Sequence, residues 1–203
     1  MQKYAGNDHY LDPETGVLKN NLGIHDQKVL EAREADYAAA RAYELAKAPL
    51  GGHFDLVHLQ AIHRYLFGDV YAWAGEIRDI DLSKDTAYFA NHRHIVSAAR
   101  PVFARLADER QLAGMDSARF SARAAYYLGE INALHPFREG NGRAQREFIN
   151  HLAYKSGFEI SWMKITREEM IQASIESFHQ GDTTLFGRLI LNNLRHREKT
   201  SQN

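Results

Sequence analysis

Apolar residues recur along most of the chain at the spacing of amphipathic helices. After Asp55, for example, Leu56, Leu59, Ile62 and Leu66 form a single apolar stripe. Asp55 is itself a residue type that caps helix starts, and only four prolines interrupt the stretches rich in Ala, Leu, Glu and Arg. The same pattern predicts further helices over about residues 26–48, 95–110, 116–134, 143–156, 166–181 and 182–194.

One segment departs from the helical period. In residues 77–83 the apolar Ile80 and Leu82 alternate with aspartates, and a period of two predicts a strand. Residues 84–86 would form a polar turn and residues 87–90 the returning strand. We therefore expect an all-α fold, a helical bundle that carries one β-hairpin.

Length and charge narrow the class of protein. The 203 residues suit one domain, and 25 Lys plus Arg against 26 Asp plus Glu give a net charge of −1. That balance argues against binding nucleic acid through charge. The absence of cysteine excludes disulfides, thiolate catalysis and cysteine-bound metals. No charge-free stretch is long enough to cross a membrane and no secretory signal is present, so we expect a cytoplasmic protein without a membrane partner.

The sequence HPFREGNGRAQR, which follows one predicted helix and opens the next, has the residue types of an anion site. Gly140 and Gly142 leave backbone N–H groups free to face a ligand, and a helix N-terminus favours phosphate. Arg143 and Arg146 are three residues apart, so they project from one helix face and can each grip a phosphoryl group. Asn141 adds a neutral donor.

Three other residues of this loop complete a candidate group-transfer site. His135 is placed to act as a general base, and Glu139 offers the single carboxylate that a phosphate-bound Mg²⁺ needs. Phe137 reads as a core anchor that fixes the loop. On their own, the glycines could form a plain turn and the arginines a solvated helix face; their co-occurrence within twelve residues favours phosphoryl or nucleotidyl transfer.

Two rival interpretations remain at this point. The chain has 11 histidines, and His92 and His94 could be a pair of metal ligands, but His58 and His63 are five residues apart and share a helix face poorly. A non-enzymatic helical module could use the two loop arginines to dock an anionic peptide. The module leaves the placement of His135 and Glu139 unexplained.

The loop resembles the motif of the Fic family, HPF-x-[D/E]-G-N-G-R-x-x-R, at all nine specified positions. The segment YAWAG, Arg78 and the predicted hairpin are similar to the YxWAG segment and the "flap" of that family. The opening, over residues 12–24, resembles bacterial Fic toxins of the FicT and VbhT type. The likeness implies a single Fic domain with a core over about 54–195, an N-terminal helical extension over about 1–50 and a frayed tail over 196–203.

By this resemblance the chain would be a protein adenylyltransferase, an AMPylator that moves AMP from ATP to a hydroxyl of a target protein with the help of Mg²⁺. His135 would deprotonate that hydroxyl, and Glu139 would bind the Mg²⁺ of ATP. The nucleotide-binding residues that the resemblance implies are Gly140, Asn141, Gly142, Arg143 and Arg146. The related Doc kinases lack this GNGR sequence and transfer the γ-phosphate instead, so a Doc-like kinase is the alternative within the same fold.

The flap residues Lys84, Asp85 and Thr86 would dock the target by strand addition, which an exposed hairpin edge permits. The plainer alternative is a hairpin that only closes the core.

A separate antitoxin is a further implied partner. Many Fic proteins inhibit themselves through an [S/T]-x-x-x-E-[G/N] helix, yet no Ser or Thr in this chain precedes a Glu by four residues. The chain therefore resembles the toxins whose small antitoxin supplies that helix, with its Glu against Arg146. Toxins of this type modify the ATPase subunits of DNA gyrase and topoisomerase IV.

Overall fold

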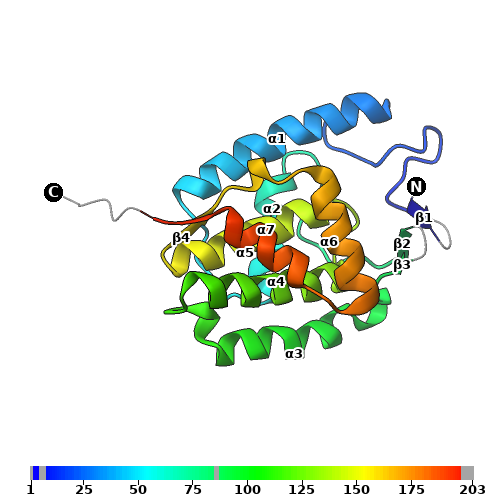
Figure 1. The fold of residues 1–203 in the computed structure, drawn as a ribbon. Helices are drawn as coiled ribbons and strands as arrows, with labels where there is room; N and C mark the ends of the chain where they lie inside the picture. The colour runs from blue at the N-terminus through cyan, green and yellow to red at the C-terminus, as the bar shows by residue number, and fades with distance from the viewer. Residues whose placement is uncertain (1, 5–7, 85–86, 198–203) are drawn as a thin grey trace.

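The computed structural model describes residues 2–4, 8–84 and 87–197, and this part of the chain is mostly helical (Figure 1). Its α-helices are α1 (Gln27–Lys47), α2 (Leu56–Phe67), α3 (Ile95–Asp108), α4 (Ser117–Leu134), α5 (Asn141–Lys155), α6 (Arg167–Gln180) and α7 (Thr184–Asn192). In the described ranges no helix has both the length and the apolar character that a membrane crossing needs. The expected helical fold is confirmed.

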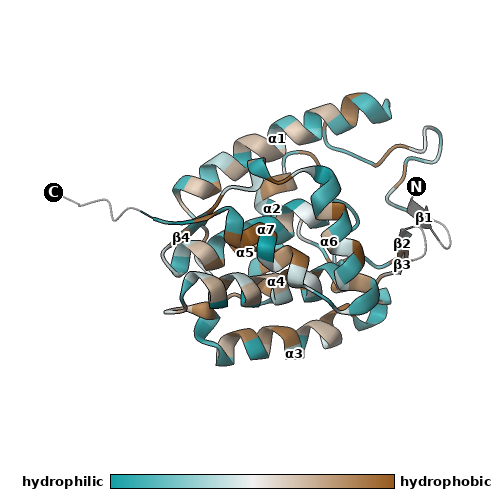
Figure 2. Cartoon of the chain, viewed as in Figure 1, coloured by the Kyte–Doolittle hydropathy of each residue, from teal (hydrophilic) through white to brown (hydrophobic). Residues whose placement is uncertain are grey.

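Helix α4 lies at the centre of the bundle and packs against α3, α5, α6 and α7. Phe120, Ala124, Tyr127 and Ile131 are each 0% exposed and share one face, and Ala125 on another side of the helix is also 0% exposed, so α4 is buried on more than one face. Helix α1 is different, because hydrophilic residues recur along it and it lies on the outside of the bundle (Figure 2). The end of α4 and the start of α5 therefore adjoin the buried centre of the fold.

The predicted helix starts are set by side chains that accept backbone N–H groups. Asp26, Asp55 and Asp116 each accept the N–H three residues ahead, and Thr166 with Glu169 forms a capping box. These contacts satisfy donors that a helix start would otherwise leave unpaired.

The predicted start of the last helix is wrong. Asp182 precedes the cap residue Thr183, and α7 begins at Thr184. The Asp182 carboxylate still accepts the Thr184 N–H at 2.8 Å, which makes a local turn before the helix rather than a helix cap.

The β-structure is partly as expected. Strands β2 (Leu82–Lys84) and β3 (Ala87–Tyr88) form the antiparallel hairpin, and β1 (Gln2–Tyr4) pairs with the other edge of β2. A second sheet joins β4 (Phe158–Ile160) to β5 (Leu194–His196). The tail expected from residue 196 therefore begins later in the described chain, since His196 pairs with Phe158.

The strand predicted over residues 77–83 is too long, because β2 starts only at Leu82. Residues 77–81 pair with no described strand and are held by side chains and by the Arg78 N–H, which donates to the Pro136 carbonyl at 2.9 Å. The Arg78 guanidinium donates to the Ile80 carbonyl at 2.6 Å, and the Asp81 carboxylate accepts the His92 N–H at 2.8 Å. The alternation of apolar and acidic residues reflects these anchors.

Candidate active site

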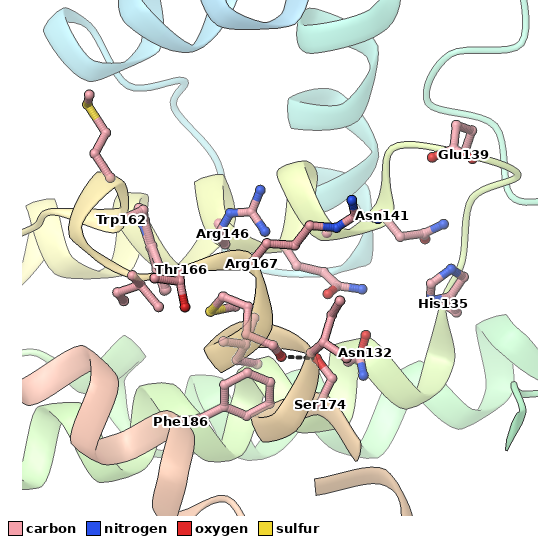
Figure 3. A pocket seen from close by; sticks show the side chains of 17 residues that line it. Asn132, His135, Glu139, Asn141, Arg146, Trp162, Thr166, Arg167, Ser174 and Phe186 are labelled. Carbon is pink, nitrogen blue, oxygen red and sulfur yellow. Dashed lines mark hydrogen bonds between the residues drawn. The ribbon is translucent and has the colours of Figure 1, made fainter. Parts of the chain in front are cut away.

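The loop between α4 and α5 lines a cavity of about 580 Å³ (Figure 3). His135 and Glu139 lie toward one end of this cavity and Trp162 toward the other, with Arg146 and Arg167 between them. A second cavity of about 810 Å³ lies between α1 and the same loop and shares Glu139, Arg146 and Arg167 with the first. The expected base, metal ligand and cation thus line one cavity.

Gly140 gives the loop a turn that other residues would not tolerate. Its φ is +77°, in the left-handed region, and it directly precedes α5. A Cβ at this position would lie 2.6 Å from the Phe67 ring. No side chain caps α5, and the Arg143 N–H donates to the Gly140 carbonyl at 3.1 Å, so the N–H groups of Asn141 and Gly142 are the ones available to an anion.

His135 is fixed from three directions. It ends α4 in the left-handed conformation, with φ of 44°, and its N–H donates to the Ile131 carbonyl at 3.0 Å. Its ring stacks on Phe89 of the hairpin at 3.7 Å between centroids. Its carbonyl accepts a hydrogen bond from Arg78 Nε at 2.8 Å. The expected general base is therefore held between the helical body and the flap.

Arg78 links the flap to this loop. Its side chain is 0% exposed, and besides Ile80 and His135 it donates to the Ala90 carbonyl at 2.5 Å. Burial lowers the pKa of the Arg78 guanidinium, and the nearby Asp81 carboxylate acts in the opposite direction. Only the family resemblance singled out this residue in the sequence.

Asn141 closes the loop on itself. Its Oδ1 accepts the Phe137 N–H at 2.9 Å, and its Nδ2 donates to the Phe137 carbonyl at 2.7 Å. Asn141 is only 3% exposed, and Phe137 is 0% exposed. The structure thus gives the Asn141 amide a loop-closing role that the sequence did not indicate.

The two loop arginines have different surroundings. Arg143 donates to the buried Glu34 of α1, which also accepts the Tyr71 hydroxyl, and the guanidinium lies 4.6 Å from the Phe67 ring centroid. Arg146 has no ion pair with any described residue. Burial, and then the charge of Arg143, lower the pKa of Arg146. An anion placed between them would relieve that repulsion.

Sequence reasoning missed several residues around the site. Glu34 occupies a buried position of α1 between Leu30 and Ala38, and a carboxylate in an apolar stripe was the available signal. Arg167 lines both cavities, and it places a cation at a helix N-terminus, where the macrodipole disfavours positive charge.

Arg138, the variable position of the motif, is also buried. It is 2% exposed, and its Nη2 lies 2.7 Å from Oδ2 of Asp8. This pair fastens the N-terminal segment to the motif loop, a contact between residues 130 positions apart that no local pattern reveals.

The expected docking segment is only partly described. Lys84 belongs to β2, whereas Asp85 and Thr86 lie outside the described residues. Lys84 pairs with Gln2 on one side and with Ala87 on the other, so β2 has no free edge at this position. Strand addition would have to use the outer edge of β1 or of β3.

Two buried histidines face each other between α2 and α5, outside the cavities that the motif loop lines. His58 is 3% exposed, its Nδ1 accepts the Phe54 N–H at 3.3 Å and its Nε2 lies 3.3 Å from Nδ1 of His151. Burial, and then the neighbouring His151, lower the pKa of His58 from 6.5 to about 4. Across the described ranges no three His, Asp or Glu side chains gather as a metal site.

The lowered pKa of His58 predicts acid sensitivity. Because protonation favours the unfolded state, stability is unaffected well above pH 6.5 and is lost as the pH falls from 6.5 toward 4. At pH 5 this histidine should destabilise the fold by about 2 kcal/mol relative to pH 7. Urea unfolding of wild type and His58→Gln at both pH values measures the difference. The exposed His94→Gln is the control and should leave the pH dependence unchanged.

The geometry defines the class of site: a cradle for a polyphosphate, with a histidine at its edge, suited to group transfer. The Fic/DOC family profile matches residues 53–153. The protein adenylyltransferase VbhT of Bartonella schoenbuchensis is 51% identical over 96% of this chain, which spans 41% of the length of that protein. The Escherichia coli protein named probable protein adenylyltransferase Fic is 37% identical, with 88% of each chain covered.

Solved structures agree with these relatives. BepC of Bartonella tribocorum with bound AMPPNP superposes with a TM-score of 0.86 at 27% identity, over 93% of this chain and 97% of that one. An N-terminal Fic domain from Bartonella quintana with bound ADP has a TM-score of 0.86 at 29% identity, over 93% of this chain and 95% of that one. The chain belongs to the Fic/DOC family. The enzyme class expected from the sequence, protein adenylyltransferase, is the one for which both of these curated relatives are named.

Proposed function

We propose that this chain transfers AMP from ATP to a hydroxyl side chain of a target protein in the bacterial cytoplasm. The observation that carries the proposal is that His135, Gly142 and Arg146 line the same cavity, at a helix start that no side chain caps. The site combines a general base with a phosphate-binding cradle. Neither feature alone would indicate a group-transfer reaction. The names of the relatives support AMP as the transferred group.

The proposed reaction uses the groups in a fixed order. The first N–H groups of α5, with Arg143 and Arg146, hold the polyphosphate of ATP. His135 takes the proton of the attacking hydroxyl, whose oxygen forms a bond to the α-phosphorus. The bond to the β-phosphate then breaks, and pyrophosphate leaves on the side held by the arginines. The hydroxyl thereby becomes a phosphodiester to AMP.

Glu139 is the residue that would hold Mg²⁺ in this site. Its Oε1 accepts the Gly140 N–H at 2.9 Å, and the carboxylate lines both cavities. One protein carboxylate fits a Mg²⁺ whose other ligands are substrate phosphates and water. When bound, the ion would neutralise phosphate charge as pyrophosphate departs.

Glu139→Gln should therefore raise the Mg²⁺ concentration needed for half-maximal transfer by about 10-fold or more, because the amide loses the negative charge that attracts the ion. A Mg²⁺ titration of the transfer rate measures this. Glu31→Gln, which changes a carboxylate of the second cavity, is the control and should leave the titration unchanged. An unshifted titration for Glu139→Gln would contradict its role as ligand.

The function itself is tested by labelling. Incubation with a bacterial lysate, Mg²⁺ and ATP labelled at the α-phosphate should transfer label to protein, whereas label at the γ-phosphate should not be transferred. Transfer of the γ-label instead would identify a Doc-like kinase. Absence of both, with purified candidate targets present and ATP binding intact, would favour an anion-binding module.

We also propose that the chain acts as a toxin restrained by a separate small antitoxin, whose glutamate would pair with Arg146. Two observations support this: Arg143 already pairs with Glu34, and the second cavity lies open beside Arg146. The ATPase subunits of DNA gyrase and topoisomerase IV are the first targets to assay. Co-expression with the gene next to that of the chain should relieve growth arrest; equal toxicity with and without it would contradict the proposal.

The proposed unit is a single Fic domain with its core over about residues 54–195 and α1 within the N-terminal extension. The contacts of Glu34 with Arg143 and of Asp8 with Arg138 support the extension as a working part of the enzyme.

A further inference from the structure

We propose that His63 is a positioning residue, which fixes the peptide that follows Glu139 and thereby the place of the Glu139 carboxylate. His63 lies on α2, outside the motif, and is 0% exposed. The inference rests on the proposed function, because Glu139 is taken as the Mg²⁺ ligand. The residue pattern of α2 indicated no role for His63.

Both ring nitrogens of His63 are used by the backbone. Nδ1 accepts the Gly75 N–H at 2.8 Å, and Nε2 lies 2.9 Å from the Glu139 carbonyl oxygen. A backbone N–H can only donate, so Nδ1 carries no proton. Nε2 then carries the proton and donates to the Glu139 carbonyl, which determines the tautomer from the partners alone.

The ring is also held by its faces. It stacks on Phe137 at 3.9 Å between centroids with an interplanar angle of 25°, and it lies 4.7 Å from the Phe67 ring. Phe67 is the side chain that leaves no room for a Cβ at Gly140. His63 therefore contacts the residues that shape the loop on either side of Glu139.

These contacts restrain the peptide between Glu139 and Gly140. The His63 hydrogen bond fixes its carbonyl, and the Glu139 carboxylate accepts its N–H at 2.9 Å. Without the histidine, this peptide could rotate, because α5 has no side-chain cap that would hold its start. Rotation would move the carboxylate away from the phosphate cradle. The side chain of His63 acts through Glu139 and touches no substrate itself.

The test separates positioning from stability by measuring the affinity for AMPPNP with Mg²⁺ and with EDTA. His63→Phe keeps the ring stack and loses both hydrogen bonds. It should lower the Mg²⁺-dependent gain in affinity by about 10-fold, the usual loss when a group supporting a metal ligand is removed. Its affinity in EDTA should stay within about twofold of wild type, since the arginines are untouched.

Two further variants test the two ring nitrogens of His63 separately. His63→Gln can place an amide N–H where Nε2 stands and should restore most of the Mg²⁺-dependent gain. His63→Asn reaches only as far as Nδ1, so it can accept from Gly75 but should not restore the gain. His58→Phe makes the same change at another buried histidine of α2 and should leave the gain unchanged.

Each result decides the inference. An unchanged gain in His63→Phe overturns it, as does an equal loss with Mg²⁺ and with EDTA, which would indicate a purely structural role. A wild type whose affinity ignores Mg²⁺ overturns it together with the assignment of Glu139. If the gain falls as expected while wild type transfers no AMP to any protein, the positioning role stands and the proposed function fails.

Discussion

Replacing His135 should abolish AMP transfer while ATP still binds. A general base contributes about 10²–10⁴-fold to a rate, and no other described histidine lines the cavity that holds Arg146. The phosphate cradle does not include the imidazole, so the affinity for ATP should change by no more than about twofold. Transfer of α-phosphate label and equilibrium ATP binding measure the two quantities separately.

The variant should be chosen with the backbone in mind. His135 has a φ of 44°, and asparagine adopts this region more readily than most residues, so His135→Asn removes the base with the least strain. His94→Ala, at an exposed histidine beyond the hairpin, is the matched control and should transfer normally. Retention of more than a tenth of wild-type transfer in His135→Asn would show that another group takes the proton.

The second large effect is expected at Arg78, where the loss is in stability. Arg78→Met keeps much of the side-chain volume but leaves the carbonyls of Ile80, Ala90 and His135 buried without this donor. An unsatisfied buried acceptor costs about 1–3 kcal/mol, so the free energy of unfolding should fall by about 3 kcal/mol or more. Urea unfolding measures the change.

A matched comparison comes from Arg64→Met. Arg64 is exposed and donates to a single carbonyl, that of Ala74, so its replacement should cost less than about 1 kcal/mol. Arg78→Lys should fall between the two, because an ammonium group is too compact to reach three carbonyls at once. A loss at Arg78→Met no larger than that at Arg64→Met would contradict the anchoring role.

The features that the sequence predicts correctly depend on residues that lie close together in the chain. Helix starts at Asp26, Asp55 and Asp116 were predictable because a cap acts on an N–H only three positions away. The motif loop was equally readable, since a left-handed glycine, a helix start and two arginines form one continuous stretch.

What the sequence could not predict joins distant segments. Strand β1 pairs with β2 across about eighty residues, and Glu34 reaches Arg143 across 109. Such contacts depend on which elements pack together, and the apolar period of a sequence shows that a face is buried but not which element covers it. The sequence allowed His63 to be compared only with His58, as a possible metal ligand on the same helix. Its hydrogen-bond partners are Glu139 of the motif loop and Gly75.

The ion pair between Arg138 and Asp8 bears on how far the chain can be shortened at its N-terminus. The stretch shared with the family, residues 53–153, contains the motif loop but neither Asp8 nor Glu34. A fragment trimmed to that stretch would expose a guanidinium that is now 2% accessible, directly beside Phe137. We therefore expect the smallest working enzyme to include Asp8 and so to be longer than the stretch that the family profile matches.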